Sequence, residues 1–232
     1  MADLLDGLRG GLIVSCQPVP GGPLDRPDIV AALALAALAG GARGLRIEGV
    51  ENLRAVRAAT RAPVIGLVKT DRADSPVRIT PTAAEARALV EAGADVVAFD
   101  ATDRPRPEPL ERIVGAIHEA GALAMADCAS LADGRRAAAL GCAMLGSTLS
   151  GYLGGAVPEG PDLGLVAELA GLGRFTLAEG RYHAPADAAR AVAAGADAVV
   201  VGSAITRPEH VTAWFVAAVE GAGRGADTRV PA

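Results

Sequence analysis

The chain has 232 residues, of which 51% are hydrophobic and 3% aromatic, and its formal net charge at pH 7 is -5. This length and hydrophobicity suffice for one well-buried domain. The acidic balance, with both signs of charge interspersed, argues against a nucleic-acid-binding surface. Three cysteines without a CxxC motif predict neither a disulfide framework nor a zinc site.

The first residues include Asp3, Asp6 and Arg9 and no hydrophobic signal region. No apolar run in the sequence is long enough to span a bilayer. We therefore expect a cytoplasmic protein with neither a membrane nor a nucleic acid as partner.

A recurring pattern organises the rest of the chain: an alanine-rich segment, a glycine and then a short apolar run. Glycine tolerates the left-handed conformation that closes many helices, so each copy indicates a helix end followed by a buried strand. The copies, together with the first apolar run and the run after Pro63, predict eight strands. These are residues 11–15, 44–47, 64–68, 96–100, 123–127, 144–147, 175–179 and 198–201.

Segments with helical spacing separate these strands, for example residues 29–38, 82–91 and 186–194. Strict alternation of strand and helix implies parallel pairing with right-handed crossovers. Eight such units close most simply into a single (β/α)8 barrel over residues 1–232, with a frayed tail from about residue 222. A doubly wound open sheet is the alternative, but no GxGxxG motif follows the first strand.

Charged side chains stand at the carboxyl ends of several predicted strands, the rim where barrel enzymes place their chemistry. Arg46 lies in the second strand and Lys69 ends the third, while Asp100, Asp127 and Glu179 end the fourth, fifth and seventh. A charge in an apolar strand must face the top of the lumen or bear a large desolvation cost. We therefore expect these groups to converge. Capping of the next helix remains an alternative for Asp100 and Asp127, and a surface position for Lys69.

Glycine pairs follow the last two strands: Gly180-Arg181 after the seventh and Gly202-Ser203 after the eighth. Glycine permits close backbone approach, and a helix start presents free N–H groups. Arg207, a few residues on, can bind phosphate oxygens bidentately. Barrels commonly bind phosphate at this place, so the pattern predicts a phosphorylated substrate. No segment offers ligands at metal spacing, which favours a site with no metal and no other cofactor.

Seven segments spread between about residues 10 and 214 resemble the N-acetylmannosamine-6-phosphate 2-epimerase family. They are GLIVSCQP (11–18), LRIEGV (45–50), DSPVRIT (74–80), TDRPRP (102–107), TLSGY (148–152), AEGRY (178–182) and GSAITR (202–207). The resemblance implies a barrel isomerase that interconverts N-acetylmannosamine 6-phosphate and N-acetylglucosamine 6-phosphate without a cofactor. It also implies a role in sialic acid and amino-sugar catabolism, and it suggests a homodimer.

The same resemblance implies roles for individual residues. Lys69 would be the catalytic acid/base, with Glu179 as its partner. The sugar would contact Gln17, Arg46 and Asp127. Arg181, from the glycine pair after the seventh strand, is expected to bind the substrate as well. The phosphate would be held by Gly180, Gly202, Ser203 and Arg207.

These residue types suit proton transfer at C2, which lies α to the C1 aldehyde once the sugar ring opens. An unperturbed lysine has a pKa of roughly 10.4, and both burial and the Arg46 cation would lower the pKa of Lys69 toward neutrality. Two other functions fit the same residues: a class I aldolase with a Schiff base at Lys69, or a sugar-phosphate sensor without catalysis.

Overall fold

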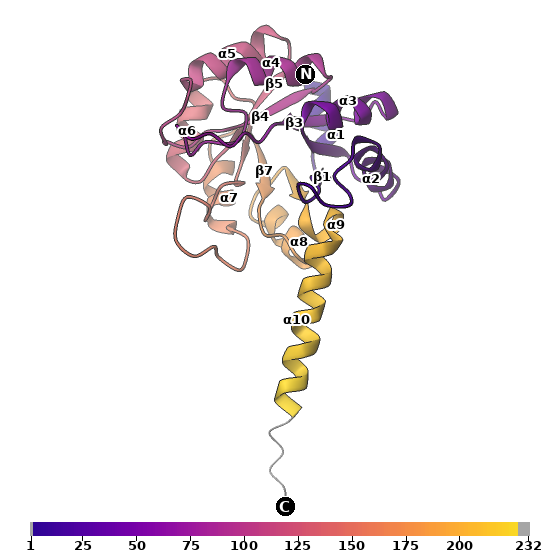
Figure 1. Ribbon diagram of the computed structural model, residues 1–232. Helices are drawn as coiled ribbons and strands as arrows, with labels where there is room; N and C mark the ends of the chain where they lie inside the picture. Colours follow the sequence, from indigo (N-terminus) through magenta and orange to yellow (C-terminus); the bar gives the residue numbers. More distant parts are fainter. Residues whose placement is uncertain (1, 227–232) are drawn as a thin grey trace, which may run out of the picture.

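The computed structural model describes residues 2–226, and its eight parallel strands form a closed barrel in sequence order (Figure 1). The strands are β1 (Gly11–Cys16), β2 (Gly44–Glu48), β3 (Val64–Leu67), β4 (Val96–Asp100), β5 (Leu123–Asp127), β6 (Met144–Gly146), β7 (Phe175–Glu179) and β8 (Ala198–Val201). Pairing between β1 and β8 closes the barrel, with Gly11 opposite Ala198. The predicted (β/α)8 barrel is confirmed, and the open sheet is excluded.

Helices connect the strands and surround the barrel (Figure 1). They are α1 (Ala2–Leu8), α2 (Pro27–Ala39), α3 (Val50–Ala59), α4 (Ala83–Glu91), α5 (Leu110–Glu119), α6 (Leu131–Ala139), α7 (Leu163–Ala170), α8 (Pro185–Ala193), α9 (Ser203–Thr206) and α10 (Pro208–Ala226). The glycines that precede strands adopt the expected left-handed backbone. Their φ angles are 98° at Gly41, 103° at Gly93, 86° at Gly121 and Gly141, 67° at Gly173 and 105° at Gly195.

The strands bury both of their faces, because alternate side chains point to opposite sides of a sheet. One set packs with the leucines of α1 in the barrel lumen: Ile13, Ile65, Leu67, Val96, Ala98, Met125, Met144, Leu177 and Val200. The intervening residues pack outward against the helices: Val14, Cys16, Leu45, Ile47, Val64, Val97, Phe99, Ala124, Ala126 and Leu145. Continued to the carboxyl ends, this alternation assigns Arg46, Lys69, Asp127 and Glu179 to the lumen side.

The amino-terminal helix α1 packs against the lumen core. Leu8 is 1% exposed and belongs to the lumen cluster, against which Leu4 and Leu5 also pack. The site at the carboxyl ends of the strands therefore rests on a continuous apolar core.

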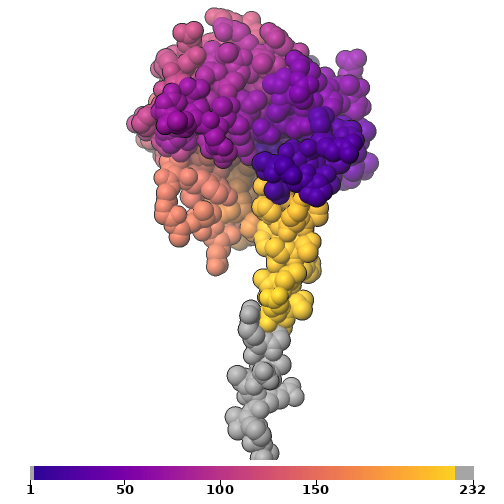
Figure 2. Space-filling view, in the orientation of Figure 1, coloured from indigo at the N-terminus to yellow at the C-terminus, as the bar shows by residue number. Residues whose placement is uncertain are grey.

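Helix α10 projects from the barrel and stands clear of its body (Figures 1 and 2). It runs through Ala226, and the frayed tail expected from about residue 222 stays a prediction. The rest of that predicted tail, residues 227–232, lies outside the described residues.

Candidate active site

A pocket of about 490 Å³ opens at the carboxyl ends of the strands. All of the predicted site residues except Asp127 line it, namely Gln17, Arg46, Lys69, Glu179, Gly180, Arg181, Gly202, Ser203 and Arg207. Asp127 is fully buried and pairs with Arg46, which does line the pocket. The eight-stranded closure thus brings together residues from β1 to β8, as the strand-end pattern predicted.

Arg46 is the centre of a buried ionic cluster. Its side chain is 3% exposed and donates from Nη2 to Asp127 Oδ2 at 2.5 Å and from Nη1 to Glu179 Oε1. Burial alone would lower the pKa of Arg46, but the two carboxylates outweigh it and raise that pKa. Breaking either ion pair would leave an uncompensated buried charge, so the three side chains hold one another in place.

Thr148, just beyond β6, also contacts both carboxyl groups. Its Oγ1 lies 2.6 Å from Asp127 Oδ1 and 3.1 Å from Glu179 Oε2. The neighbouring Ser147 ties the ends of β6 and β7 together, because its hydroxyl donates to the Glu179 carbonyl at 2.9 Å and accepts from the Glu179 N–H at 3.1 Å. The cluster therefore closes into a ring of Arg46, Asp127, Thr148 and Glu179.

Lys69 follows β3 and reaches the pocket, where its Nζ donates to Gln17 Oε1 at 2.7 Å. Gln17 is itself oriented by donation from Nε2 to Ser15 Oγ at 2.8 Å. Lys69 as a whole is an exposed residue, yet its ammonium group contacts Gln17 inside the pocket. Desolvation, followed by the cations Arg46 and Arg207, lowers the pKa of Lys69 to about 8.

Burial raises the pKa values of the two carboxyl groups of the ring, whereas it lowers the pKa of Lys69. Desolvation and the neighbouring Asp127 raise the pKa of Glu179 to about 7, against the opposing pull of Arg46. Burial raises the pKa of Asp127 as well, while Arg46 and Thr148 oppose that rise. A lysine with a lowered pKa and a glutamate with a raised one form a pair suited to proton transfer near neutral pH.

The predicted phosphate residues gather on the side of the pocket formed by β1, β7 and β8. Gly202 is packed so closely that a Cβ there would lie 3.3 Å from Ser15 Cβ, which explains a glycine at this turn. Ser203 begins α9 directly after it, and Arg207 donates from Nε to the Gln17 carbonyl at 2.6 Å. That bond leaves the Nη groups of Arg207 available for an anion.

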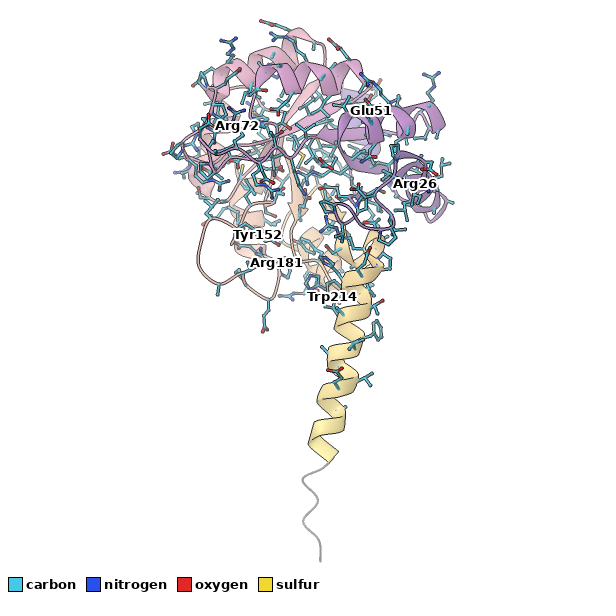
Figure 3. All side chains as sticks on the ribbon, viewed as in Figure 1. Arg26, Glu51, Arg72, Tyr152, Arg181 and Trp214 are labelled. Atoms are coloured by element: carbon cyan, nitrogen blue, oxygen red, sulfur yellow. The ribbon has the colours of Figure 1, made fainter. Side chains whose placement is uncertain are left out.

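Arg181 lines the pocket but directs its guanidinium toward a loop. It donates from Nε to the Gly160 carbonyl at 2.7 Å and from Nη1 to the Ser150 carbonyl, and it lies over the Tyr152 ring, 5.3 Å from the centroid. Figure 3 shows Tyr152 and Arg181 together on this side of the barrel. Arg181 thus holds the 150–160 loop beside the pocket.

The helix-capping alternatives for two aspartates are excluded. Helix α6, which follows Asp127, is capped by Ser130. Helix α5, which follows Asp100, has Pro109 as its N-cap residue and no side-chain cap. Asp100 instead orders its own loop, accepting from the Thr102 N–H at 2.9 Å.

Among the pocket residues without a role in the sequence-based prediction are Thr148, Arg78 and Arg104. All three lie in segments that resemble the epimerase family. For Arg78 and Arg104, this resemblance was the sequence evidence that could have pointed to the site. For Thr148 there was a second signal, because it continues the lumen-facing alternation of Met144 and Gly146. Within residues 2–226, no group of three or more His, Cys, Asp or Glu side chains could hold a metal ion.

Together, the fold and the site define a (β/α)8-barrel protein with a buried ionic ring and a lysine at the carboxyl-terminal face. A sequence model described as "Putative N-acetylmannosamine-6-phosphate epimerase" matches residues 30–221. The chain belongs to this family.

Individual relatives agree over nearly the whole chain. Proteins named "Putative N-acetylmannosamine-6-phosphate 2-epimerase" are 54% identical over 214 residues in Actinobacillus pleuropneumoniae serotype 5b (92% of this chain, 93% of the relative) and 53% identical over 220 residues in Haemophilus influenzae (95% and 96%). The solved N-acetylmannosamine-6-phosphate 2-epimerase from Clostridium perfringens superposes with a TM-score of 0.89 at 38% identity, covering 92% of this chain and 95% of that one.

No helix among the described residues is both long and apolar enough to cross a membrane.

Proposed function

We propose that the chain catalyses the C2 epimerisation of N-acetylmannosamine 6-phosphate to N-acetylglucosamine 6-phosphate, within sialic acid and amino-sugar catabolism. The observation that carries this proposal is the pairing of Lys69, whose pKa is lowered to about 8, with Glu179, whose pKa is raised to about 7, at one pocket. A pocket of about 490 Å³ is also large enough for a hexosamine phosphate.

The reaction needs a base, an acid and stabilisation of the developing charge. Neutral Lys69 removes the C2 proton of the ring-opened sugar, and electrons move to the C1 oxygen to give an enediol-like intermediate. Glu179 returns a proton to the other face of C2, which inverts that centre without a change of oxidation state. Arg46, held beside Glu179, stabilises the oxyanion.

The phosphate group anchors the substrate at the ends of β7 and β8. Gly180 and Gly202 allow the backbone to approach it closely, while Ser203 and Arg207 supply a hydroxyl and a guanidinium. Gln17, Asp127 and Arg181 complete the proposed substrate site by orienting Lys69, Arg46 and the 150–160 loop.

Proton NMR of N-acetylmannosamine 6-phosphate in deuterated water tests the proposal. We expect the C2 proton signal to disappear in the presence of the protein while the N-acetylglucosamine 6-phosphate signals grow. A spectrum in which neither change occurs would exclude epimerisation.

The two other functions that the sequence allowed are not favoured. The relatives that match across the chain are named as epimerases, not as aldolases or sensors. Borohydride treatment with substrate gives an independent check, because an aldolase would leave a trapped adduct on Lys69 and the epimerase would not.

We also propose that the chain forms a homodimer through α10. The projecting helix exposes Phe215 by 70%, Val219 by 72% and Val216 by 49% on one face. An exposed row of large apolar side chains commonly marks a protein interface. Two copies of the same helix offer identical faces, as a twofold interface requires.

Sedimentation over a range of protein concentrations tests the dimer. Phe215→Glu should shift the chain toward the monomer, because it places a charge in the apolar face. Ala217→Glu puts the same charge on the opposite, exposed side of α10 and serves as the control. A wild-type protein that sediments as a monomer at all concentrations would refute the dimer.

We further propose a cytoplasmic location. Cys16, Cys128 and Cys142 are free and buried, a state that suits a reducing compartment. Fractionation of cells that produce the tagged chain would test this, and recovery outside the cytoplasmic fraction would contradict it.

A further inference from the structure

The hydrogen-bond contacts of the ionic ring require one more proton than Arg46 and Thr148 supply. Arg46 supplies an N–H to one oxygen of each carboxyl group, Asp127 Oδ2 and Glu179 Oε1. The remaining two oxygens, Asp127 Oδ1 and Glu179 Oε2, both lie within hydrogen-bond distance of Thr148 Oγ1. A hydroxyl has a single proton and can donate to only one of them.

The two distances indicate where that proton lies. Thr148 Oγ1 is 2.6 Å from Asp127 Oδ1, a length typical of donation from a hydroxyl to a carboxylate. The contact with Glu179 Oε2 is longer, 3.1 Å, and would join two oxygens without a proton if Glu179 were ionised. It becomes a normal hydrogen bond when Glu179 carries the proton and donates it to Thr148.

The charge balance of the site leads to the same assignment. Arg46 is 2% exposed and compensates one carboxylate, whereas the ring contains two. Lys69 is the other cation near Glu179, and it must be neutral to accept the C2 proton. With Lys69 neutral, the buried ring is balanced only if one of its carboxyl groups is protonated.

We propose that Thr148 is a positioning residue that assigns this proton, donating its own hydroxyl proton to Asp127 and accepting a hydrogen bond from protonated Glu179. The inference rests on the proposed function, in which Glu179 delivers a proton to C2. Thr148 would keep Asp127 ionised as the partner of Arg46 and would keep Glu179 protonated, ready to donate its proton.

The backbone around Thr148 explains how it can hold this position. On one side, the Leu149 N–H donates to the Cys128 carbonyl at 3.0 Å and the Cys128 N–H donates to the Gly146 carbonyl at 2.8 Å. On the other side, Ser147 bonds both backbone groups of Glu179. The hydroxyl is therefore fixed between the ends of β5 and β7, which carry the two carboxyl groups.

Infrared difference spectroscopy of the full chain without substrate tests the proposal directly. At a pH one unit below the pKa of about 7 of Glu179, the wild type should show the C=O stretch of a buried protonated carboxylic acid. Glu179→Gln should remove that band and Asp127→Asn should not. The opposite pattern, or no such band in the wild type, would overturn the assignment.

Substitution of Thr148 gives a second, independent readout. Thr148→Val removes the acceptor of the Glu179 proton, so the band should titrate at lower pH, and Thr148→Ser should restore the wild-type midpoint. If Thr148 instead donated to ionised Glu179, Thr148→Val would move the midpoint to higher pH, and that result would overturn the proposal. Thr176→Val, a buried change in β7 away from the ring, is the control for threonine replacement itself.

Turnover completes the test. We expect Thr148→Val to lower kcat by about 10- to 100-fold, the usual effect of losing a hydrogen bond to a charged group, with KM nearly unchanged and Thr148→Ser active. A Thr148→Val enzyme with wild-type kcat would refute the role. Failure of the proposed function would instead appear as absent NMR turnover in the wild type, which leaves the infrared assignment untouched.

Discussion

Lys69 shows how one side chain acquires a chemical role from its surroundings. Its ammonium is held by Gln17 and faces the cations Arg46 and Arg207, which favour the neutral form that a base requires. No other lysine occurs in the chain, so its replacement removes the only primary amine of a side chain.

Replacing Lys69 with alanine should therefore stop the reaction and spare binding. General acid–base catalysis contributes about 10²- to 10⁴-fold, so we expect Lys69→Ala to lower kcat by at least that factor. Phosphate affinity, measured by calorimetry, should stay close to the wild type because Ser203 and Arg207 remain. Lys69→Arg keeps a cation that does not deprotonate and should be equally inactive. Normal turnover in either variant would remove Lys69 from its role.

The pH dependence follows from the two shifted pKa values. Below about 7 both Lys69 and Glu179 hold a proton and the base is unavailable; above about 8 neither does and the acid is lost. We therefore expect a bell-shaped profile of kcat/KM with limbs near these values, which belong to the pair as a whole.

Arg207 sets the position of the upper limb. As a cation beside Lys69 it disfavours the ammonium form, so Arg207→Met should raise the pKa of Lys69 and move the descending limb to higher pH. Arg207→Lys keeps the charge and should leave that limb in place. A profile that stays fixed in Arg207→Met would contradict the electrostatic explanation.

At the scale of elements, β6 ends in a glycine that makes room for the ring. A Cβ at Gly146 would lie 2.8 Å from Met125 Cε, 3.0 Å from Thr148 Oγ1 and 3.6 Å from Asp127 Oδ1. The Met125 side chain can turn aside, but Thr148 would have to shift by a few tenths of an ångström from its position between the two carboxyl groups.

Gly146→Ala should therefore reduce activity more than its effect on folding explains. Overpacking of this kind costs about 1–3 kcal/mol, which urea unfolding would measure. Gly66→Ala in β3 is a matched control, since its Cβ would meet Ala94 Cβ at 3.0 Å and Leu53 Cδ2 at 3.1 Å, away from the site. We expect similar destabilisation in both variants and loss of kcat only in Gly146→Ala.

The strands and their site-facing ends were predictable because they depend on local patterns. Glycine-closed helices and short apolar runs located all eight strands to within about two residues, as expected for such boundaries. The alternation that placed Ile65 and Leu67 in the lumen also placed Lys69 there. Charges at those positions could then only meet at the open rim.

The partners of each side chain were less predictable, since they depend on register across the barrel. Arg46 and Glu179 are 133 positions apart, and only the closure of the barrel brings them into contact. Thr148 is neither charged nor distinctive in sequence, so its contact with two carboxyl groups becomes evident only with distances. Arg181, expected at the substrate, lines the pocket, but its bonds to the Gly160 and Ser150 carbonyls could not be read from the sequence.

For the whole molecule, stability and chemistry lie at opposite ends of the barrel. Leu8 is buried in the lumen core beneath the site. Leu8→Ala should destabilise the protein by about 2–5 kcal/mol, the usual cost of a cavity in a core. The variant's kcat, measured where it remains folded, should stay unchanged.

Unfolding in urea gives the measurement, and Leu35→Ala is its control. Leu35 is a leucine of α2 that is 44% exposed, so its truncation should cost less than about 0.5 kcal/mol. Equal losses in the two variants would mean that α1 does not contribute to the core as described.

Trp214 gives the molecule a built-in optical probe. It is the only tryptophan of the chain and lies near the start of α10 (Figure 3). Its ring packs against His183 at a tilt of 43°, with ring centroids 4.4 Å apart. His183 lines the pocket, so an occupant that moves this imidazole changes the surroundings of a single indole. Fluorescence excited at the tryptophan absorption band would then report pocket occupancy without an added label, because all of that signal comes from one residue.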